Sequence, residues 1–299
     1  MPLVSIVIPT CNRTGDLRRC LSKLLPLLPA DGRVDTIVCD DGSSDESRRM
    51  IATNFPAVRW SQGPRRGPGA NRNLGGKLAD SEWLVFLDDD CIPREGFLDA
   101  YLKAFSATGA KGLFHGFTYP VPEPTSLSYE APDVRAPAKI FASCNFAIRK
   151  SLFEVTGGFD ERYTIAFEDI EYFARLDRLG ADAQCIPEAA VDHPLRPLPA
   201  FVKLGKRWEG RVISTMDLGA GPMQVAIRLP KHALAVILSR FRGQKPSLGN
   251  VKAAIAFAGE FLYMMTHLPG WIRKHSREPH SRFWTEQVAL GKAPPRFGL

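Results

Sequence analysis

Hydrophobic and polar residues alternate along the first part of the chain in blocks that predict strands and helices in turn. The runs at 3–8 (LVSIVI), 34–39 (VDTIVC) and 83–87 (WLVFL) are almost uninterrupted and rich in β-branched residues, as in strands buried on both faces. Apolar residues at 17–28 and 97–105 recur with the spacing of one helix face. This alternation predicts an α/β fold with a mostly parallel, doubly wound sheet.

Weaker patterns add further elements to this sheet. A short strand is predicted at 58–60, and a glycine-rich loop at 64–69 precedes a helix that contains Asn73, Leu74 and Leu78. Asp45 stands where it can cap the helix that follows the second strand.

The middle of the chain is less regular. Residues 111–140 are rich in proline and aromatic residues and predict an irregular excursion. They are followed by a predicted strand at 140–148, a helix at 168–179 and a last strand at 181–187, which ends near 192–194.

The last third of the chain predicts helices, at 198–215, 225–241 and 250–268. The run at 253–265 is strongly apolar but contains Glu260, and it is shorter than the roughly 20 residues that a membrane span needs. Two interpretations stay open for it: a helix that lies in the plane of a membrane surface, or ordinary core packing, which is the simpler one.

Charge divides the chain into two regions. Residues 1–195 carry 22 Lys/Arg and 27 Asp/Glu, whereas residues 196–299 carry 17 and 5. We therefore predict an α/β domain at 1–195 and a basic, mainly helical C-terminal region at 196–299. The basic region either is a solvated surface or faces anionic phosphates or an anionic membrane. Nucleic acid is not an expected partner, because no DNA- or RNA-binding motif accompanies the charge.

The composition excludes other classes of protein. With 44% hydrophobic and 24% charged residues the chain is globular rather than disordered. Its six cysteines occur singly, which argues against a zinc ribbon or a redox motif and predicts reduced thiols. The opening MPLVSIVIPT lacks the pattern of a signal peptide, so a cytoplasmic location is expected.

Polar clusters follow three of the predicted strands, at 9–13, 40–45 and 88–90. In a parallel sheet these strand ends share the edge at which ligands bind. Asp40 and Asp41 at the second end either accept hydrogen bonds from a nucleobase or form a simple turn.

The triplet Asp88-Asp89-Asp90 predicts a divalent cation, because three adjacent carboxylates repel one another and oxygen ligands suit a hard ion. Residues two apart on an extended chain point the same way, so Asp88 and Asp90 are expected to share one ion while Asp89 points elsewhere. His193 is a candidate third ligand, and an imidazole ligand favours Mn²⁺ over Mg²⁺. An exposed His before proline is the alternative.

Basic and acidic residues further along the chain extend this site. Arg66 and Arg72 flank the start of a helix after a glycine-rich loop, which suits phosphate binding or a solvated loop. The loop has neither a Walker ending nor a dinucleotide fingerprint. Glu168 and Asp169 begin a helix, where the dipole favours acidic residues; one of them is also a candidate base.

The order of these motifs resembles the family 2 glycosyltransferases, which have a GT-A fold. The segments that carry the resemblance are VSIVIPTCNR, CDDGSSD, GPGANRNLG, WLVFLDDDC, SCNFAIRKSLFEVTGGFDE and FEDIEYFARL, followed by His193, and they cover about residues 1–195. The resemblance implies a Rossmann-like nucleotide-sugar-binding sheet and a metal-dependent, inverting hexosyltransferase (EC 2.4). It implies a UDP-sugar donor in preference to other nucleotide sugars, and a glycan or lipid-linked acceptor in the synthesis of surface polysaccharide or glycolipid.

The resemblance also implies roles for individual residues. Asp169 is the expected base, with Glu168 as the second candidate. The residues expected to bind the nucleotide sugar are Pro9, Thr10, Asp40, Asp41, Arg72, Asp88 and Asp89. Asp88, Asp90 and His193 are the expected metal ligands, and the candidates for phosphate or acceptor contact are Arg66, Phe159, Asp160, Arg207 and Arg211.

The chain departs from the processive polysaccharide synthases of this family. Their QxxRW motif has its nearest counterpart here in 204–208 (LGKRW), with Leu in place of Gln, and no membrane span is predicted. We therefore expect a non-processive enzyme of the bacterial type, with peripheral contact at the inner face of the cell membrane. The alternatives are a sugar-nucleotide nucleotidyltransferase and a non-catalytic nucleotide-sugar-binding relative.

Overall fold

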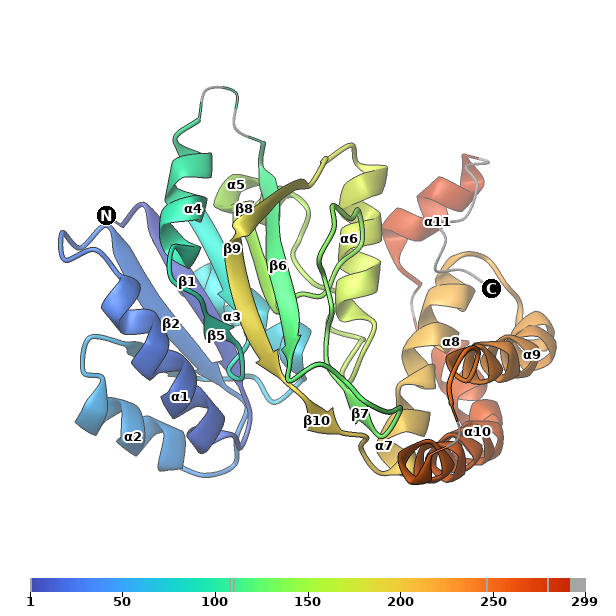
Figure 1. The fold of residues 1–299 in the computed structure, drawn as a ribbon. Coiled ribbons are helices and arrows are strands. Elements are labelled where there is room, and N and C mark those ends of the chain that lie inside the picture. The colour runs from blue at the N-terminus through green and yellow to red at the C-terminus, as the bar shows by residue number, and fades with distance from the viewer. Residues whose placement is uncertain (1, 108, 110, 246, 279, 291–299) are drawn as a thin grey trace. The chain divides into compact units, whose positions relative to one another are not determined.

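The apolar runs form the strands of an eight-stranded sheet in this computed structural model, which describes residues 2–107, 109, 111–245, 247–278 and 280–290. The chain divides into two units. The first comprises the chain up to Pro122, Ala131–Thr164 and Glu168–Pro194; the second comprises Glu123–Glu130, Ile165–Phe167 and the chain from Leu195. Figure 1 shows the elements of both units.

The sheet of the first unit has the strand order β3-β2-β1-β4-β8-β6-β9-β5. Four of these strands, β1 (Val4–Thr10), β2 (Val34–Asp40), β3 (Arg59–Gln62) and β4 (Trp83–Leu87), pair in parallel. The others are β5 (Ile92–Pro93), β6 (Leu113–Val121), β8 (Asn145–Arg149) and β9 (Gln184–Pro194). Of these, β6 and β9 are parallel, while β8 is antiparallel to both β4 and β6.

Helices cover both faces of this sheet, so the predicted doubly wound, mostly parallel α/β fold is confirmed. One face carries α1 (Thr14–Leu24), with η1 (Leu25–Leu27), α2 (Glu46–Asn54) and α4 (Phe97–Phe105). The other face carries α3 (Pro68–Leu78), α5 (Lys150–Val155) and α6 (Glu168–Arg178). Alternate residues of β1 supply the two cores, Ile6 and Ile8 to the first and Val7 to the second.

The prediction of an irregular excursion at 111–140 is wrong for its first part, because residues 113–121 form β6 near the middle of the sheet. Gly116 and Pro120, which suggest a turn in the sequence, lie inside this strand. A side chain at Gly116 would place its Cβ 1.7 Å from the carbonyl oxygen of Ala189, so the glycine permits the close approach of β9. The strand predicted at 140–148 begins later, at Asn145.

Two further local predictions are corrected. Asp45 occupies the position before α2, but its side chain makes no capping hydrogen bond to that helix. The last strand begins later than predicted, at Gln184, but it ends at Pro194, within the predicted range, and so includes His193.

The second unit is helical, as the C-terminal pattern predicts. It contains α7 (Phe201–Lys206), α8 (Trp208–Asp217), α9 (Pro222–Arg240), α10 (Leu248–His275) and α11 (Arg282–Ala289). A short antiparallel pair, β7 (Tyr129–Glu130) and β10 (Arg196–Pro197), belongs to the same unit. None of the helices among the described residues has the length and apolar character needed to cross a bilayer.

The packing of α10 accounts for Glu260 in the apolar run. Its carboxylate is buried and accepts hydrogen bonds from Trp208 Nε1 (2.8 Å) and Arg240 Nη1 (2.9 Å). Ala253, Phe257 and Met264 on the same side of α10 are buried among the other helices of the unit. Core packing therefore explains one face of this helix.

Candidate active site

The carboxyl ends of β1, β2 and β4 lie side by side at one edge of the sheet, as the parallel topology requires. Thr10 and Asp40 are register partners at the ends of β1 and β2. The residues after β4 form a tight turn, in which Cys91 N donates to Asp88 O (3.1 Å) and Asp88 N donates to Cys144 O (3.1 Å). This turn places the three aspartates at the edge without further strand pairing.

Asp89, the middle carboxylate, is buried in a polar cage. It accepts hydrogen bonds from Thr10 Oγ1 (2.6 Å) and Arg13 Nη1 (3.2 Å). Burial raises the pKa of Asp89 to about 7, although Arg13 and the Thr10 hydrogen bond lower it. Asp89 thus ties the acidic turn to the end of β1, but it shares Arg13 with Asp90, whereas Asp88 pairs with Arg72, so the three carboxylates are not divided as predicted.

Arg13 is a site residue that the sequence reasoning did not select. The same Nη1 lies 3.0 Å from Asp90 Oδ2, so one guanidinium pairs with two adjacent carboxylates. Its side chain is 44% exposed, which leaves the guanidinium accessible to a ligand. The sequence analysis included it only as the last residue of the polar cluster at 9–13, without a role of its own.

Asp90 and His193 face each other although they are far apart in the sequence. His193 Nε2 lies 3.2 Å from Asp90 Oδ1, and both side chains are buried. The other ring nitrogen, Nδ1, lies 3.0 Å from the carbonyl oxygen of Pro194. A proton on Nδ1 would donate to that carbonyl and leave the Nε2 lone pair directed at the carboxylate, an arrangement frequent in metal-binding histidines.

The pKa of His193 reflects this neighbour. Burial lowers it, but the hydrogen bond and the negative charge of Asp90 outweigh burial and raise the pKa to about 9. In the protein without a cation, a protonated imidazole therefore balances the charge of Asp90. A cation at the same place would replace that proton.

Antiparallel pairing of β5 with β9 brings these two residues together. Ile92 is the register partner of Asp192 and Pro93 that of Val191, so the end of β9 runs past the acidic turn. The side chain of Asp192 turns elsewhere and pairs with Arg94 (2.6 Å). This alternation along β9 directs His193 toward Asp90.

The donor atoms at this position fit a divalent cation. Those of Asp90, Cys91 and His193 all lie within 4.8 Å of one another, and all three residues are buried. A carboxylate and an imidazole suit Mn²⁺, whereas the Cys91 sulfur is a softer ligand that was not predicted. Asp88 is not in this group, because Arg72 engages its carboxylate; its predicted metal contact stays a prediction.

Arg72 on α3 links the two acidic motifs of the site. It is buried, with Nη2 2.6 Å from Asp88 Oδ1 and Nη1 3.2 Å from Glu168 Oε1. Its guanidinium lies 5.5 Å from the ring centroid of Phe159, a cation–π distance. Burial lowers the pKa of Arg72, but the charges of Asp88 and Glu168 raise it by more than burial lowers it, so the side chain stays charged.

Glu168 and Asp169 stand together at the start of α6. Burial raises the pKa of Glu168 to about 7, the charge of Asp169 raises it too, and Arg72 opposes both. The pKa of Asp169 is also raised by burial, although Arg72 and backbone hydrogen bonds, among them one from Ile170 N (2.8 Å), lower it. A carboxylate whose pKa is raised toward neutrality is a stronger base.

The Asp40–Asp41 pair organises two loops. Asp40 is buried and accepts from Gly42 N (2.7 Å). Asp41 accepts from Arg65 N (2.8 Å) and Gly67 N (3.0 Å), which fixes the glycine-rich loop against the end of β2. These contacts explain why both carboxylates stand there; nucleobase binding by them stays a prediction.

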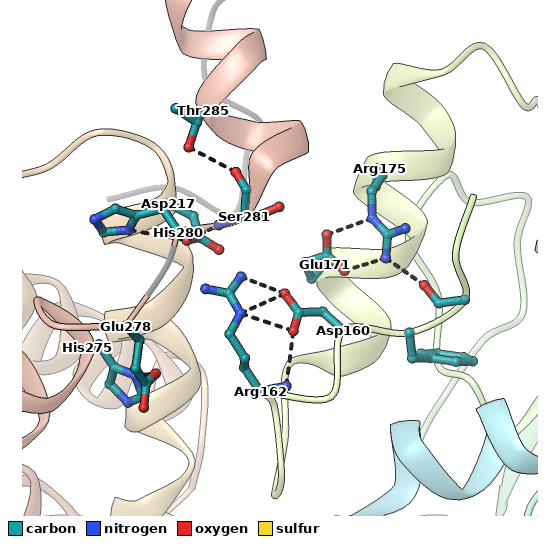
Figure 2. A network of polar contacts seen from close by, with 12 residues as sticks. Asp160, Arg162, Glu171, Arg175, Asp217, His275, Glu278, His280, Ser281 and Thr285 are labelled. Carbon is teal, nitrogen blue, oxygen red and sulfur yellow. Dashed lines mark hydrogen bonds and ion pairs between the residues drawn. The ribbon is translucent and has the colours of Figure 1, made fainter. Parts of the chain in front are cut away.

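The remaining candidates lie in other surroundings. In the first unit, Phe159 is 2% exposed, Asp160 pairs with Arg162 as Figure 2 shows, and Arg66 pairs with Glu161 (2.7 Å). Asp160 thus has an internal partner, and Phe159 supports Arg72 from the core. Pro9 is buried within β1.

Arg207 and Arg211 belong to the second unit. Arg207 makes two hydrogen bonds to Glu130 (2.6 and 2.9 Å), and the Arg211 guanidinium lies 4.6 Å from the ring centroid of Phe167. Their predicted contact with phosphate or acceptor stays a prediction.

Comparisons with solved structures agree with this architecture. The chain superposes on *Staphylococcus aureus* TarS residues 1–349 with a TM-score of 0.57 at 18% identity, covering 99% of this chain and 93% of that one. A mannosyltransferase from *Pyrobaculum calidifontis*, in complex with GDP-Man and Mn²⁺, gives a TM-score of 0.52 at 16% identity, covering 97% and 79%. These likenesses show the fold: a GT-A-type α/β sheet with C-terminal helices.

Sequence comparisons define the family. The family model described as glycosyl transferase family 2 matches residues 5–159, and the chain belongs to that family. Glycosyltransferase AglE of *Haloferax volcanii* is 24% identical over 216 residues, which are 68% of this chain and 70% of AglE. The pre-mycofactocin glycosyltransferase of *Mycobacterium tuberculosis* is 30% identical over 64% of this chain and 43% of that protein.

A validoxylamine A glucosyltransferase of Streptomyces hygroscopicus is 27% identical over 60% of this chain and 49% of that protein. The chain thus spans less than half the length of this relative and of the pre-mycofactocin glycosyltransferase. The predicted family is confirmed, and the chain is a glycosyltransferase.

Proposed function

We propose that this enzyme is an inverting, divalent-metal-dependent glycosyltransferase. It moves a sugar from a nucleoside diphosphate sugar, preferably a UDP sugar, to a hydroxyl group of a glycan or lipid-linked acceptor. The observation that carries the proposal is that His193 faces Asp90. Beside them Arg72 joins Asp88 to Glu168, and Asp169 follows Glu168 in the chain. The first pair has the donors for a cation, and the second has carboxylates with raised pKa values.

The donor is assigned to the edge formed by β1, β2 and β4. TarS has been solved in complex with UDP and with UDP-GlcNAc, and the mannosyltransferase in complex with GDP-Man, which supports a nucleotide-sugar donor for this fold. Thr10 and Asp40 stand at adjacent strand ends, where the nucleoside would lie. Asp41 would act on it through the glycine-rich loop, whose backbone it holds.

Asp90 and His193, with Asp88, would hold the divalent ion, with Mn²⁺ preferred. When bound, such an ion neutralises the negative charge of a departing diphosphate. Arg13 and Arg72 add two positive charges beside the same carboxylates, and Arg13 is accessible to a phosphate. Positioning and neutralisation of charge would supply most of the rate.

Asp169 is the proposed base. In a direct displacement the bond between the anomeric carbon and the diphosphate oxygen breaks while a bond to the acceptor oxygen forms on the opposite side. The acceptor proton passes to Asp169, and the anomeric configuration inverts. Burial raises the pKa of Asp169, and the charge of Asp88 raises it too, which increases the proton affinity of the base, while Arg72 holds the neighbouring Glu168.

The proposed setting is the synthesis of surface polysaccharide or glycolipid, with one or few sugars added per acceptor. The enzyme would then work in the cytoplasm, in peripheral contact with the inner face of the membrane, where lipid-linked acceptors are found. The net positive charge of residues 196–299 supports this setting.

A thermal-shift screen of nucleoside diphosphates with and without Mn²⁺, followed by assay of UDP-sugar hydrolysis and transfer, tests the proposal. Asp90→Asn should abolish the Mn²⁺-dependent shift. Asp169→Asn should keep that shift but lower turnover by at least about a hundredfold. Asp192→Asn on β9 and Asp177→Asn on α6 are matched controls, because their carboxylates pair with Arg94 and Lys139 instead.

Three outcomes would contradict the proposal. If none of the nucleoside diphosphates raises the melting temperature, the protein has no donor site of this kind. Release of pyrophosphate from a nucleoside triphosphate and a sugar phosphate would identify a nucleotidyltransferase. Nucleotide binding without hydrolysis or transfer, whatever acceptor is offered, would identify a non-catalytic relative.

A further inference from the structure

An exposed apolar stripe runs along α10 on the side opposite its buried face. The stripe repeats every three or four residues, with exposed fractions between 40% and 74%: Leu248, Val251, Ile255, Leu262 and Met265. Ala258, also exposed, fills the gap between Ile255 and Leu262. A helix that packs only by its inner face normally carries charged residues on its outer face, so this side of α10 lacks the usual solvated surface.

The neighbouring helix α9 has the same character. Its inner residues Val225, Leu229 and Ala233 are buried, while its outer apolar residues are 46–71% exposed: Met223, Ile227, Leu234 and Leu238. Helices α9 and α10 pack on each other, and both pack on α8. We call the exposed apolar residues named for these two helices the α9–α10 surface.

The charges around this surface are of one sign. Residues 218–277 contain nine Lys/Arg and one acidic residue, Glu260, whose carboxylate is buried against Trp208 and Arg240. Exposed basic side chains stand at both ends of α10 and on α9: Arg228, Lys231, Arg242, Lys245, Lys252, Arg273 and Arg277. Lys274 is exposed too, but it pairs with Glu209 (2.9 Å). Within this segment no exposed carboxylate is present to balance them.

We infer that the α9–α10 surface docks on an anionic lipid bilayer. Apolar side chains of this size enter the boundary between headgroups and acyl chains, and basic side chains beside them meet lipid phosphates. The helices would lie on the membrane, which agrees with the finding that neither can cross it. A second copy of the chain fits less well, because pairing two such surfaces would bring basic residues together without acidic partners.

This inference assigns residues to the membrane contact of the proposed function, and it rests on that proposal only for its biological setting. The basic charge of this region was evident in the sequence, but which apolar residues are exposed was not. The buried face of α10 confirms core packing for part of residues 253–265, and the interpretation as a membrane-surface helix stays a prediction for the exposed face.

Co-sedimentation of the full chain with vesicles tests the inference. Vesicles of phosphatidylcholine alone are compared with vesicles that contain about 30% phosphatidylglycerol, at low and high salt. We expect binding to the anionic vesicles, weakened by salt. The double variant Ile255→Gln, Leu262→Gln should lower the partition coefficient at least about tenfold. Arg242→Gln with Lys245→Gln should lower it roughly fivefold per residue.

Val155→Gln is the matched control, because Val155 is 80% exposed but lies on α5 in the first unit. It should bind vesicles like the wild type, and all variants should unfold within about 2 °C of it, since the substituted side chains are exposed. If the apolar double variant does not fold, the charge variant carries the test. Thermal shift with UDP and Mn²⁺ in solution separately reports on the donor site, so the two proposals can fail independently.

The inference is overturned if the wild type stays in the supernatant with anionic vesicles, or if neither double variant lowers binding. Equal binding to neutral vesicles overturns the assignment to anionic lipid. Light scattering supplies the other decisive result: a dimer that the Ile255→Gln, Leu262→Gln pair converts to a monomer, without vesicle binding, would assign the surface to a second copy.

Discussion

The guanidinium of Arg72 lies 2.6 Å from Asp88 and, through its other terminal nitrogen, 3.2 Å from Glu168. One buried cation from α3 therefore holds the acidic turn after β4 and the acidic start of α6 at a fixed separation. Because the Arg72 and Glu168 side chains are only 3% and 8% exposed, loss of any member would leave a charge with little solvent to stabilise it.

Substitution of this cation should destabilise the first unit strongly. We expect Arg72→Met to lower the free energy of unfolding by about 3–5 kcal/mol, because it leaves the buried Glu168 and the partly buried Asp88 without their partner. Arg72→Lys should lose less, since it keeps the charge but cannot span both carboxylates. Urea denaturation measures both. Arg66→Met, in the same segment but 62% exposed, should change stability by no more than about 0.5 kcal/mol. Equal effects at the two positions would contradict this prediction.

Stability should depend on pH through Glu168. Its pKa rises from 4.5 to about 7 on folding, so between these values the folded state binds more protons than the unfolded state. The stability associated with the protonated Glu168 is fully present below pH 4.5 and is lost as the pH rises through 7. Glu168→Gln removes this titration. Its stability relative to the wild type should therefore increase by up to about 3 kcal/mol between pH 4.5 and pH 7.5.

Chemical denaturation of the two proteins across this pH range gives the comparison. Only the difference between them is informative, because other groups titrate in both. A difference that stays constant with pH would mean that Glu168 ionises in the folded protein at its ordinary value.

Cys91 lies at the predicted cation site, but its sulfur is not a ligand that Mn²⁺ prefers. Its sulfur is within 4.8 Å of the donor atoms of Asp90 and His193, yet thiolates prefer softer metals than Mn²⁺. We expect Cys91→Ala to leave the affinity for Mn²⁺ within about twofold while lowering that for Cd²⁺ at least about tenfold. Competition titrations with both ions measure this. A loss of Mn²⁺ affinity as large as that of Asp90→Asn would instead make Cys91 a ligand for Mn²⁺.

The glycine-rich loop depends on the conformation of Gly67. This residue has a φ of +94°, and a Cβ there would lie 2.3 Å from the carbonyl oxygen of Thr164. Gly67→Ala should therefore lower the free energy of unfolding by at least about 3 kcal/mol, because it adds both backbone strain and the clash. Gly32→Ala is the matched comparison, because φ is +74° but no atom lies within 4 Å; strain alone should cost about 1 kcal/mol. Thermal unfolding that ranks the two equally would show that the loop adapts.

Local sequence predicted much of the first unit. The buried strands β1, β2 and β4 could be predicted because a strand enclosed on both faces needs a continuous apolar run. Few other structures tolerate such a run. Strand β6 was missed because Gly116 and Pro120 suggest a turn wherever the partner strand is unknown. The close approach of Ala189 O and Asn145 Nδ2, known from the tertiary structure, explains the glycine.

The candidate site shows the same division. Asp88, Asp90, Asp169 and His193 were named from the order of motifs, because their positions follow strand and helix ends that the sequence marks. Arg13 was missed, since its pairing with Asp89 and Asp90 joins segments far apart in the chain. Phe159 was expected beside an acceptor but is buried under Arg72, which no spacing rule indicates.

The sequence by itself determined the α/β class, the helical C-terminal region, the family and the residue types available for chemistry. These depend on local periodicity and on motif order, which are properties of the linear chain. Tertiary structure alone decided that His193 faces Asp90, that Arg72 joins Asp88 to Glu168, and which apolar residues of α10 stay exposed. Such facts depend on strand register and helix packing, in which residues far apart in the chain become neighbours.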